Sequence, residues 1–182
     1  MEWVSVVVVL IVVAVVVVGL WWGLRERSSR RDLIRAIQKV SHDSLADILI
    51  PDGLGGEIYI DHLLLTPRGL VVLDVKDVQG SVFAGERLDL WSATSSQGRV
   101  EFDNPLPTLQ DRTAALNQLL PGVPIETRVV FQQSVSFPKG HPDNVRTLEN
   151  FVAEYESVSA HEDGGDYGGH WETLKSAATY SQ

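Results

Sequence analysis

The longest hydrophobic segment of the chain is residues 3–24, which carry no charge and include eleven valines. At about 1.5 Å per residue, a helix of this length measures roughly 33 Å and can cross a hydrocarbon core of about 30 Å. A secretory signal peptide has a positively charged start and a small-x-small cleavage site. Here Met1 and Glu2 carry no side-chain cation, and no such cleavage site follows the segment. The pattern predicts a retained transmembrane anchor over residues 1–24.

A basic juxtamembrane segment, residues 25–31, follows this anchor and contains four arginines. Cytoplasmic flanks of membrane helices are enriched in such residues. We therefore expect the N-terminus to face out and the rest of the chain to face the cytoplasm, at an inner or plasma membrane. The same arginines can contact anionic lipid headgroups. They could also be a nucleic-acid site, but their position next to the membrane favours a role in setting the topology.

Alternating polar and apolar residues predict two strands within residues 57–78. The intervening Thr66-Pro67-Arg68-Gly69 suits a turn, because proline presets φ and glycine tolerates a positive φ. An antiparallel hairpin is the expected structure.

The register of this hairpin decides which side chains meet. If Thr66 pairs with Gly69, Asp61 lies directly opposite Asp74, and Lys76 follows two residues later on the same face. A three-residue loop with one bulge would instead place the two carboxylates on opposite faces.

Directly opposed carboxylates repel, and a divalent cation between them is the simplest remedy. Asp61 and Asp74, together with a backbone carbonyl, suit Mg²⁺, which leaves its other positions to water and phosphate. Lys76 can then orient or deprotonate a water for attack on a phosphodiester. The alternative is that Asp74 and Lys76 form an ordinary surface ion pair that contributes about 0–1 kcal/mol.

The rest of the hydrophobic pattern predicts one α/β domain over residues 32–157 and a mobile, acidic, glycine-rich tail over residues 158–182. Helical spacing predicts helices at 31–41, 107–120 and 146–157. Apolar runs predict further strands at 81–84, near 87–91 and at 125–132, with loops at 51–56 and 92–98.

Charge narrows the range of functions. The chain has a formal net charge of −9, and setting aside Glu2 and the four arginines and one glutamate of residues 25–31 leaves −11 for residues 32–182. DNA affinity rests largely on phosphate neutralisation, so an acidic domain cannot coat a duplex non-specifically, although a local groove can still bind. The absence of cysteine excludes disulfides, thiolate zinc sites and a cysteine nucleophile.

Several motifs occur together in the part of the chain that follows the predicted anchor. They are Ile-Asp-His-Leu-Leu-Leu-Thr-Pro-Arg-Gly-Leu-Val-Val-Leu-Asp-Val-Lys at 60–76, Gly80, Trp91, Asn-Pro at 104–105, Gln110, and Arg-Val-Val-Phe at 128–131. Over about residues 32–135 the chain resembles the nuclease-related domain (NERD) family, which is similar to the PD-(D/E)xK nucleases. The resemblance implies a restriction-endonuclease-like fold, a mixed β-sheet flanked by helices, here preceded by one transmembrane helix.

The resemblance also implies roles for individual residues. Asp61 and Asp74 match the metal-binding acids of the motif, for Mg²⁺ or Mn²⁺, and Lys76 matches its lysine. Gln110 matches a helical glutamine found near the active site of related nucleases.

Two further acids are candidate metal ligands. Members of the family often carry a Gly-Glu pair in the first helix, where this chain has Arg31-Asp32, so Asp32 can replace that glutamate or simply complement the helix dipole. Glu57 faces the same way as Asp61, but about 13 Å of strand separates the two.

The expected function is hydrolysis of nucleic-acid phosphodiesters by a membrane-anchored, nuclease-like protein that faces the cytoplasm. Its expected partners are nucleic acid, with DNA the first expectation, and the membrane through residues 3–24. The alternative is a catalytically inactive, membrane-tethered module on the same fold that binds nucleic acid or protein. The acidic composition and the missing Gly-Glu pair suit this alternative.

Overall fold

The structure, a computed structural model, describes residues 3, 13, 16, 29–159 and 166–180. The chain forms two compact units, residues 1–35 and residues 36–182. Apart from three positions, the predicted anchor lies outside the described residues. Within the described ranges, no helix has the length and apolar character needed to span a membrane.

A helix runs through residues 29–40, close to the predicted span of 31–41. In the second unit, Ala36, Ile37 and Val40 of this helix are buried. Ser41 then ends it, and its amide and hydroxyl groups both donate hydrogen bonds to the carbonyl of Ile37.

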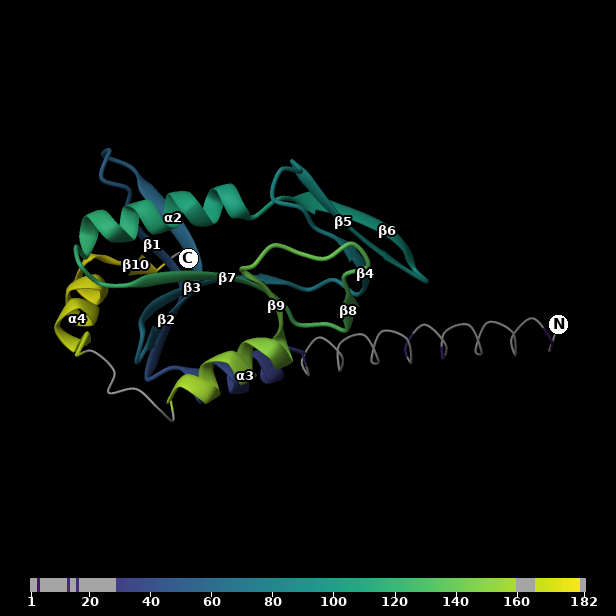
Figure 1. Cartoon of the computed structure of the whole chain (residues 1–182), viewed down its shortest axis with the longest axis horizontal. Coiled ribbons are helices and arrows are strands. Elements are labelled where there is room, and N and C mark those ends of the chain that lie inside the picture. The colour runs from purple at the N-terminus through teal and green to yellow at the C-terminus, as the bar shows by residue number, and fades with distance from the viewer. Residues whose placement is uncertain (1–2, 4–12, 14–15, 17–28, 160–165, 181–182) are drawn as a thin grey trace. The chain divides into compact units, whose positions relative to one another are not determined.

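The main sheet of the second unit has six strands in the order β10-β1-β2-β3-β7-β9 (Figure 1). Neighbouring strands are antiparallel from β10 to β3, whereas β7 is parallel to both β3 and β9. The strands are β1 (Asp43–Pro51), β2 (Glu57–Thr66), β3 (Gly69–Lys76), β7 (Ile125–Phe131), β9 (Val145–Thr147) and β10 (Thr179–Tyr180). The predicted hairpin, the predicted strand at 125–132 and the mixed α/β class are confirmed.

A second sheet has the order β6-β5-β4-β8, with strands β4 (Gly80–Phe83), β5 (Leu90–Ser95), β6 (Gly98–Asp103) and β8 (Val135–Ser136). The predicted strand at 81–84 is confirmed, but the prediction of a loop at 92–98 is wrong. Trp91 and Ala93 are buried and hold β5 against the core despite its polar residues. Gly98, at φ +124°, supports the tight turn into β6.

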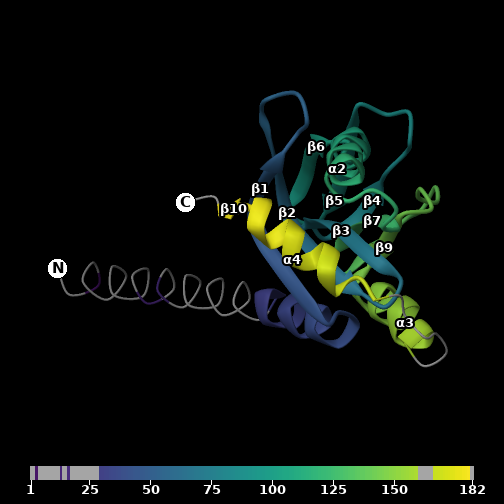
Figure 2. The ribbon, with the colours of Figure 1, turned by 90° about the vertical axis from the view of Figure 1, so that its left-hand side faces the viewer.

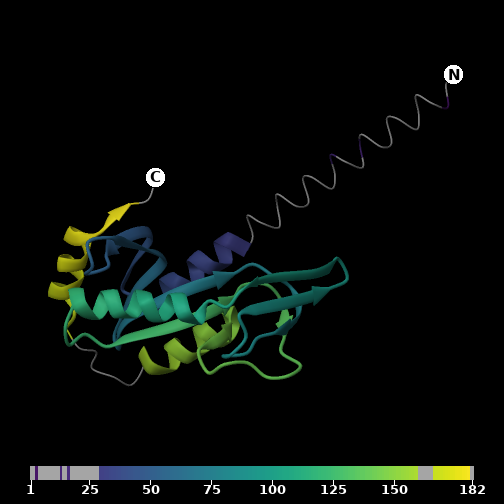
Figure 3. The same cartoon turned by 90° about the horizontal axis from the view of Figure 1, so that it is seen from above.

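Helix α2 (Leu106–Leu119) confirms the helix predicted at 107–120. Its start is fixed by Asn104, whose side chain accepts a hydrogen bond from the Leu106 amide and donates to the carbonyls of Glu86 and Leu88. Leu109 and Leu116 are buried on the side of the helix that packs on the core. Seen from above, α2 runs alongside β7 (Figure 3).

Helix α3 (Leu148–Ser159) matches the helix predicted at 146–157. It lies on the opposite face of the main sheet from α2 (Figure 2). Phe151 and Tyr155 are its buried aromatic residues.

The prediction of a mobile tail is wrong for residues 166–180. These residues include α4 (Gly168–Ala177) and β10, which pairs with β1 at the edge of the main sheet. Trp171 and Leu174, three residues apart, are buried in the core, and the Trp171 indole donates a 2.8 Å hydrogen bond to Asp43. Their apolar burial fixes a segment whose composition is otherwise polar. Residues 160–165 of the predicted tail lie outside the described residues.

Candidate active site

The β2–β3 hairpin has the predicted register. Thr66 pairs with Gly69 and His62 pairs with Leu73, so the next position along places Asp61 opposite Asp74. The Thr66 hydroxyl donates a 2.9 Å hydrogen bond to the Gly69 carbonyl and closes the turn. The three predicted residues Asp61, Asp74 and Lys76 therefore lie on one face of the sheet.

Asp74 and Lys76 are in contact near the end of β3. Asp74 is buried, with 7% of its surface exposed, and its Oδ1 lies 2.6 Å from Lys76 Nζ. The Lys76 ammonium also lies 5.9 Å from the ring centroid of Phe102 in the second sheet. Lys76 is half-buried, so its charge sits between the two sheets and not in open solvent.

Asp61 and Asp74 are linked by a residue that the sequence analysis did not identify. Arg112 of α2 places Nη1 2.8 Å from Asp61 Oδ2 and 3.7 Å from Asp74 Oδ2. Its Nε donates a 2.7 Å hydrogen bond to the carbonyl of Tyr59. A guanidinium thus lies where we expected a divalent cation. Arg112 shares the buried face of α2 with Leu109 and Leu116, and a charge at such a position was the available signal.

Two buried polar atoms of this cluster lack a hydrogen bond among the described residues: Asp74 Oδ1 and Arg112 Nη1. Their ion pairs are short, but the angles are not those of hydrogen bonds. Buried polar atoms in folded proteins nearly always have a partner, so each such exception calls for an explanation. A ligand with both cationic and anionic groups to offer, such as a metal ion with a phosphate, would satisfy both.

A third carboxylate extends the row. Asp47 of β1 lies opposite Asp61, because Ala46 pairs with His62 and Ile48 pairs with Ile60. The Tyr59 hydroxyl donates a 2.5 Å hydrogen bond to Asp47 Oδ1. This bond, followed by burial and by the negative charges of Asp47 and Asp61, raises the pKa of Tyr59 to about 12.

The other predicted site residues lie elsewhere. Gln110 is exposed and lines a cavity of about 830 Å³ together with Asn117 and Asn144, and the two motif carboxylates are not part of its lining. Glu57 is exposed at the start of β2 and accepts a 3.5 Å hydrogen bond from Thr179. Asp32 belongs to the first unit, where it forms an ion pair with Arg35. In the part of the chain that the structure describes, no three His, Asp or Glu side chains are grouped as a metal site requires.

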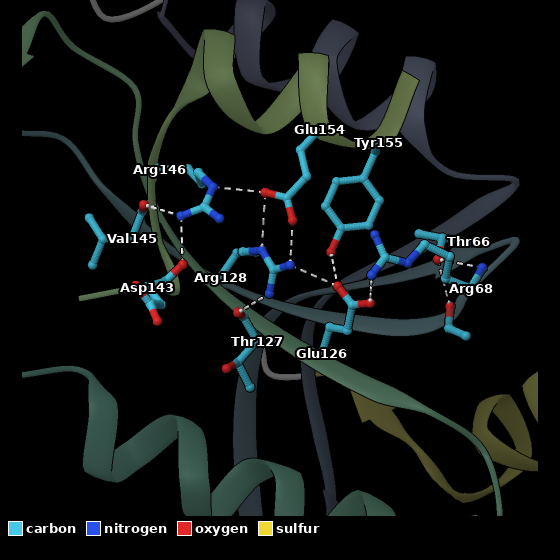
Figure 4. Close-up of polar contacts among 11 residues, drawn as sticks. Thr66, Arg68, Glu126, Thr127, Arg128, Asp143, Val145, Arg146, Glu154 and Tyr155 are labelled. Atoms are coloured by element: carbon cyan, nitrogen blue, oxygen red, sulfur yellow. Dashed lines mark hydrogen bonds and ion pairs between the residues drawn. The ribbon is translucent and has the colours of Figure 1, made fainter. Parts of the chain in front are cut away.

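A second charged cluster lies on the α3 side of β7 (Figure 4). Glu126 accepts hydrogen bonds from Arg128 and the Tyr155 hydroxyl and pairs with Arg68 of the hairpin turn, at distances of 2.6–2.9 Å. Burial, followed by the hydrogen bond to Glu126, raises the pKa of Tyr155 above its usual range. The cluster connects the turn, β7 and α3, and we interpret it as structural because its charges are mutually paired.

Glu154 completes that cluster from α3. Its carboxylate accepts hydrogen bonds from Arg128 and Arg146, the latter at 2.8 Å. Burial alone would raise the pKa of Glu154, but the hydrogen bonds and charges of the two arginines outweigh it and hold that pKa below its usual value. Burial likewise opposes the charge of Arg128, yet the hydrogen bond to Glu154 and the nearby negative groups raise the pKa of its guanidinium.

A known protein family covers the strands and the helix that carry this site. Residues 25–132, more than half of the chain, match the family model of the nuclease-related domain. The chain belongs to the NERD family. The matched region contains Asp61, Asp74, Lys76 and Arg112 and ends at β7, so β8, β9, α3, α4 and β10 lie beyond it. No curated protein and no solved structure matches the chain.

Proposed function

We propose that this protein is a metal-dependent nuclease that hydrolyses phosphodiester bonds. The observation that carries the proposal is the convergence of Asp61, Asp74 and Lys76 on one face of a hairpin whose register is the expected one. Two carboxylates and a lysine at this spacing supply the groups that hydrolytic phosphoryl transfer needs.

The proposal includes the restriction-endonuclease-like fold. The order of elements supports it: a helix, the three antiparallel strands β1, β2 and β3, then α2 and the strand β7 parallel to β3. The β4–β6 strands form an insertion between β3 and α2. The site lies on the α2 face of this sheet, where Arg112 reaches it.

Asp61 and Asp74 would hold the Mg²⁺ or Mn²⁺ ion. Both offer hard carboxylate oxygens, and the buried Asp74 Oδ1 lacks a hydrogen bond among the described residues, which suits a ligand of such a cation. A bound divalent cation supplies charge neutralisation at the phosphodiester and makes a nearby water more acidic.

Lys76 would act on the attacking water. Its Nζ is 2.6 Å from Asp74 Oδ1, so the carboxylate holds the ammonium at the edge of the site. From there the ammonium can orient the water and donate a proton to the leaving oxygen, and only the neutral amine left after that transfer can accept one.

We further propose that residues 3–24 anchor the protein in an inner or plasma membrane and that residues 36–182 face the cytoplasm. The uncharged length of the segment and the arginines after it support this orientation. The substrate is then nucleic acid close to the membrane, and DNA is the first substrate to test. The acidic composition predicts recognition through a local groove and not through a broad basic surface.

One observation favours a second candidate, a binding module without hydrolysis. Lys76 is paired with Asp74, and Arg112 occupies the space between the two carboxylates. If these contacts persist with substrate, the site neither holds a metal nor activates water.

Cleavage of labelled single- and double-stranded DNA and RNA by the full-length chain, with Mg²⁺ or Mn²⁺, distinguishes the two. We expect metal-dependent cutting that Asp74→Asn abolishes and Asp89→Asn, at an exposed position outside the site, leaves intact. Folded protein that cuts none of these substrates with either metal would favour the binding module.

A further inference from the structure

Arg112 supplies a positive charge where the opposed carboxylates need one. Its Nη1 is within ion-pair distance of both Asp61 and Asp74, and the residue is only 6% exposed. Without the charge of Arg112, the buried carboxylate of Asp74 and the half-buried carboxylate of Asp61 would lie beside each other as two anions, which is strongly unfavourable. The carboxylate pair is therefore stable without any metal.

Contacts other than the carboxylates hold Arg112 in place. Its Nε donates to the Tyr59 carbonyl at 2.7 Å, and its Cζ lies 6.0 Å from the centre of the Tyr59 ring. The Tyr59 hydroxyl is in turn fixed by Asp47 on β1. Strands β1 and β2 and helix α2 thus position a guanidinium that has one terminal nitrogen without a hydrogen bond among the described residues.

We propose that Arg112 is a built-in counter-cation that holds Asp61 and Asp74 together in the metal-free protein and competes with a divalent cation for them. The inference rests on the proposed function, because it concerns the same carboxylates. Arg112 is then a positioning residue. It keeps the two carboxylates together and lowers their affinity for a divalent metal ion. A metal ion can occupy the pair only when the guanidinium moves away from it.

The test is Mn²⁺ affinity, measured on the full-length chain in mild detergent by the electron paramagnetic resonance signal of free Mn²⁺. Arg112→Met removes the charge and retains much of the apolar side chain. We expect it to bind Mn²⁺ at least about tenfold more tightly than the unaltered chain, because a cation at the carboxylates no longer meets the positive charge of the guanidinium a few ångströms away. Structural damage alone would weaken binding.

Three further variants make the test specific. Arg99→Met removes an exposed arginine that pairs with Glu101, and it should leave Mn²⁺ affinity unchanged. Asp74→Asn measures the Mn²⁺ held elsewhere on this acidic chain. Arg112→Lys lacks the Nε bond to Tyr59 and can turn away from the carboxylates, so it should also bind more tightly, but less so than Arg112→Met.

Thermal unfolding provides a second readout. Without metal, Arg112→Met should melt at a lower temperature than the unaltered chain does. Added Mn²⁺ should raise the melting temperature of Arg112→Met by more than it raises that of the unaltered chain. If Arg112→Met does not fold without metal, Arg112→Lys carries the comparison.

Two results would overturn the inference, and they are distinguishable. If the unaltered chain binds more Mn²⁺ than Asp74→Asn does, but the Arg112 variants bind no more tightly, Arg112 is no competitor and the proposed metal site stands. If the unaltered chain and the Arg112 variants bind no more Mn²⁺ than Asp74→Asn, the carboxylate pair holds no metal, and the metal dependence of the proposed function fails as well.

Discussion

Glu154 shows how a single charge fastens a helix to the sheet. Its carboxylate lies between Arg128 of β7 and Arg146 of β9 (Figure 4), and the two arginines hold its pKa below the usual 4.5. The unfolded chain therefore takes up this proton first as the pH falls. The stabilisation is complete above about pH 4.5 and is lost as the pH falls through the lower pKa of the folded protein.

Glu154→Gln should lower the free energy of unfolding by about 1–3 kcal/mol near pH 7, because the two guanidinium groups would then donate to a neutral acceptor instead of a carboxylate. The difference should shrink as the pH falls from 7 to 3, because the unfolded chain takes up this proton below about pH 4.5 and the charged carboxylate then stabilises the folded protein less. Urea unfolding at both pH values measures it. Glu156→Gln, on an exposed position of the same helix, is the control and should stay within about 0.5 kcal/mol. Equal effects of both variants, or a difference that does not change with pH, would contradict this account.

At the residue scale, the sequence predicted what strand periodicity controls and missed what tertiary packing controls. Asp61 and Asp74 follow from alternation and from a two-residue turn, so their opposition could be foreseen. Arg112 could not be paired with them, because the rotation of α2 over the sheet is set by packing. Gln110, two residues earlier, lies on another side of α2 for the same reason.

At the element scale, the turn between β2 and β3 sets the register of the candidate site. Gly69 adopts φ +122°, and a methyl group added there would collide with the carbonyl oxygen of Pro124. That same oxygen accepts a hydrogen bond from the Leu70 amide and joins the start of β3 to the segment before β7. The turn thus controls both the hairpin and its connection to the next strand.

Gly69→Ala should be clearly more destabilising than Gly98→Ala. Gly98 has a similar φ of +124°, but no atom lies within 4 Å of the added methyl group. Gly98→Ala measures the backbone strain alone, about 1–3 kcal/mol, and the collision at Gly69 should add at least about 1 kcal/mol. Chemical denaturation of both variants compares them. Equal losses would show that the close approach to Pro124 does not constrain the turn.

Elements were predicted well where hydrophobic periodicity was strong and poorly where a few large side chains determine the structure. Helices α2 and α3 and strand β7 have clear apolar patterns, and each was placed within a few residues. In contrast, β5 depends on the burial of Trp91 and α4 on the burial of Trp171, which a polar composition conceals. In both, one tryptophan outweighs the polar residues around it.

At the scale of the whole molecule, the chain combines a NERD region with C-terminal elements that complete the main sheet. Beyond the matched residues, β9 pairs with β7 and β10 pairs with β1, so the last segments form the two edge strands. Both edge strands are very short, three residues in β9 and two in β10, and short edge strands limit pairing with other chains. The N-terminal segment adds the proposed membrane attachment, which determines where the nuclease would act.

The proposed topology predicts a specific labelling pattern, and the chain makes the experiment simple because it contains no cysteine. In intact cells, a membrane-impermeant maleimide should label Glu2→Cys and should label Ser96→Cys, in the exposed β5–β6 turn, only after lysis. The protein should also stay with membranes after an alkaline wash. Labelling of Ser96→Cys in intact cells would contradict the orientation, and release by the wash would contradict the anchor.

The single-turnover cleavage rate of Lys76→Ala, compared with that of Lys139→Ala, shows whether the hairpin carries a nuclease site. Lys139 is an exposed lysine outside the site, so its loss controls for the change in net charge. We expect Lys76→Ala to cut nucleic acid about 10²–10⁴-fold more slowly than the unaltered chain, and Lys139→Ala to cut at close to the unaltered rate. Equal rates for the two folded variants would show that Lys76 takes no part in the cleavage and that the nuclease site does not lie on this hairpin.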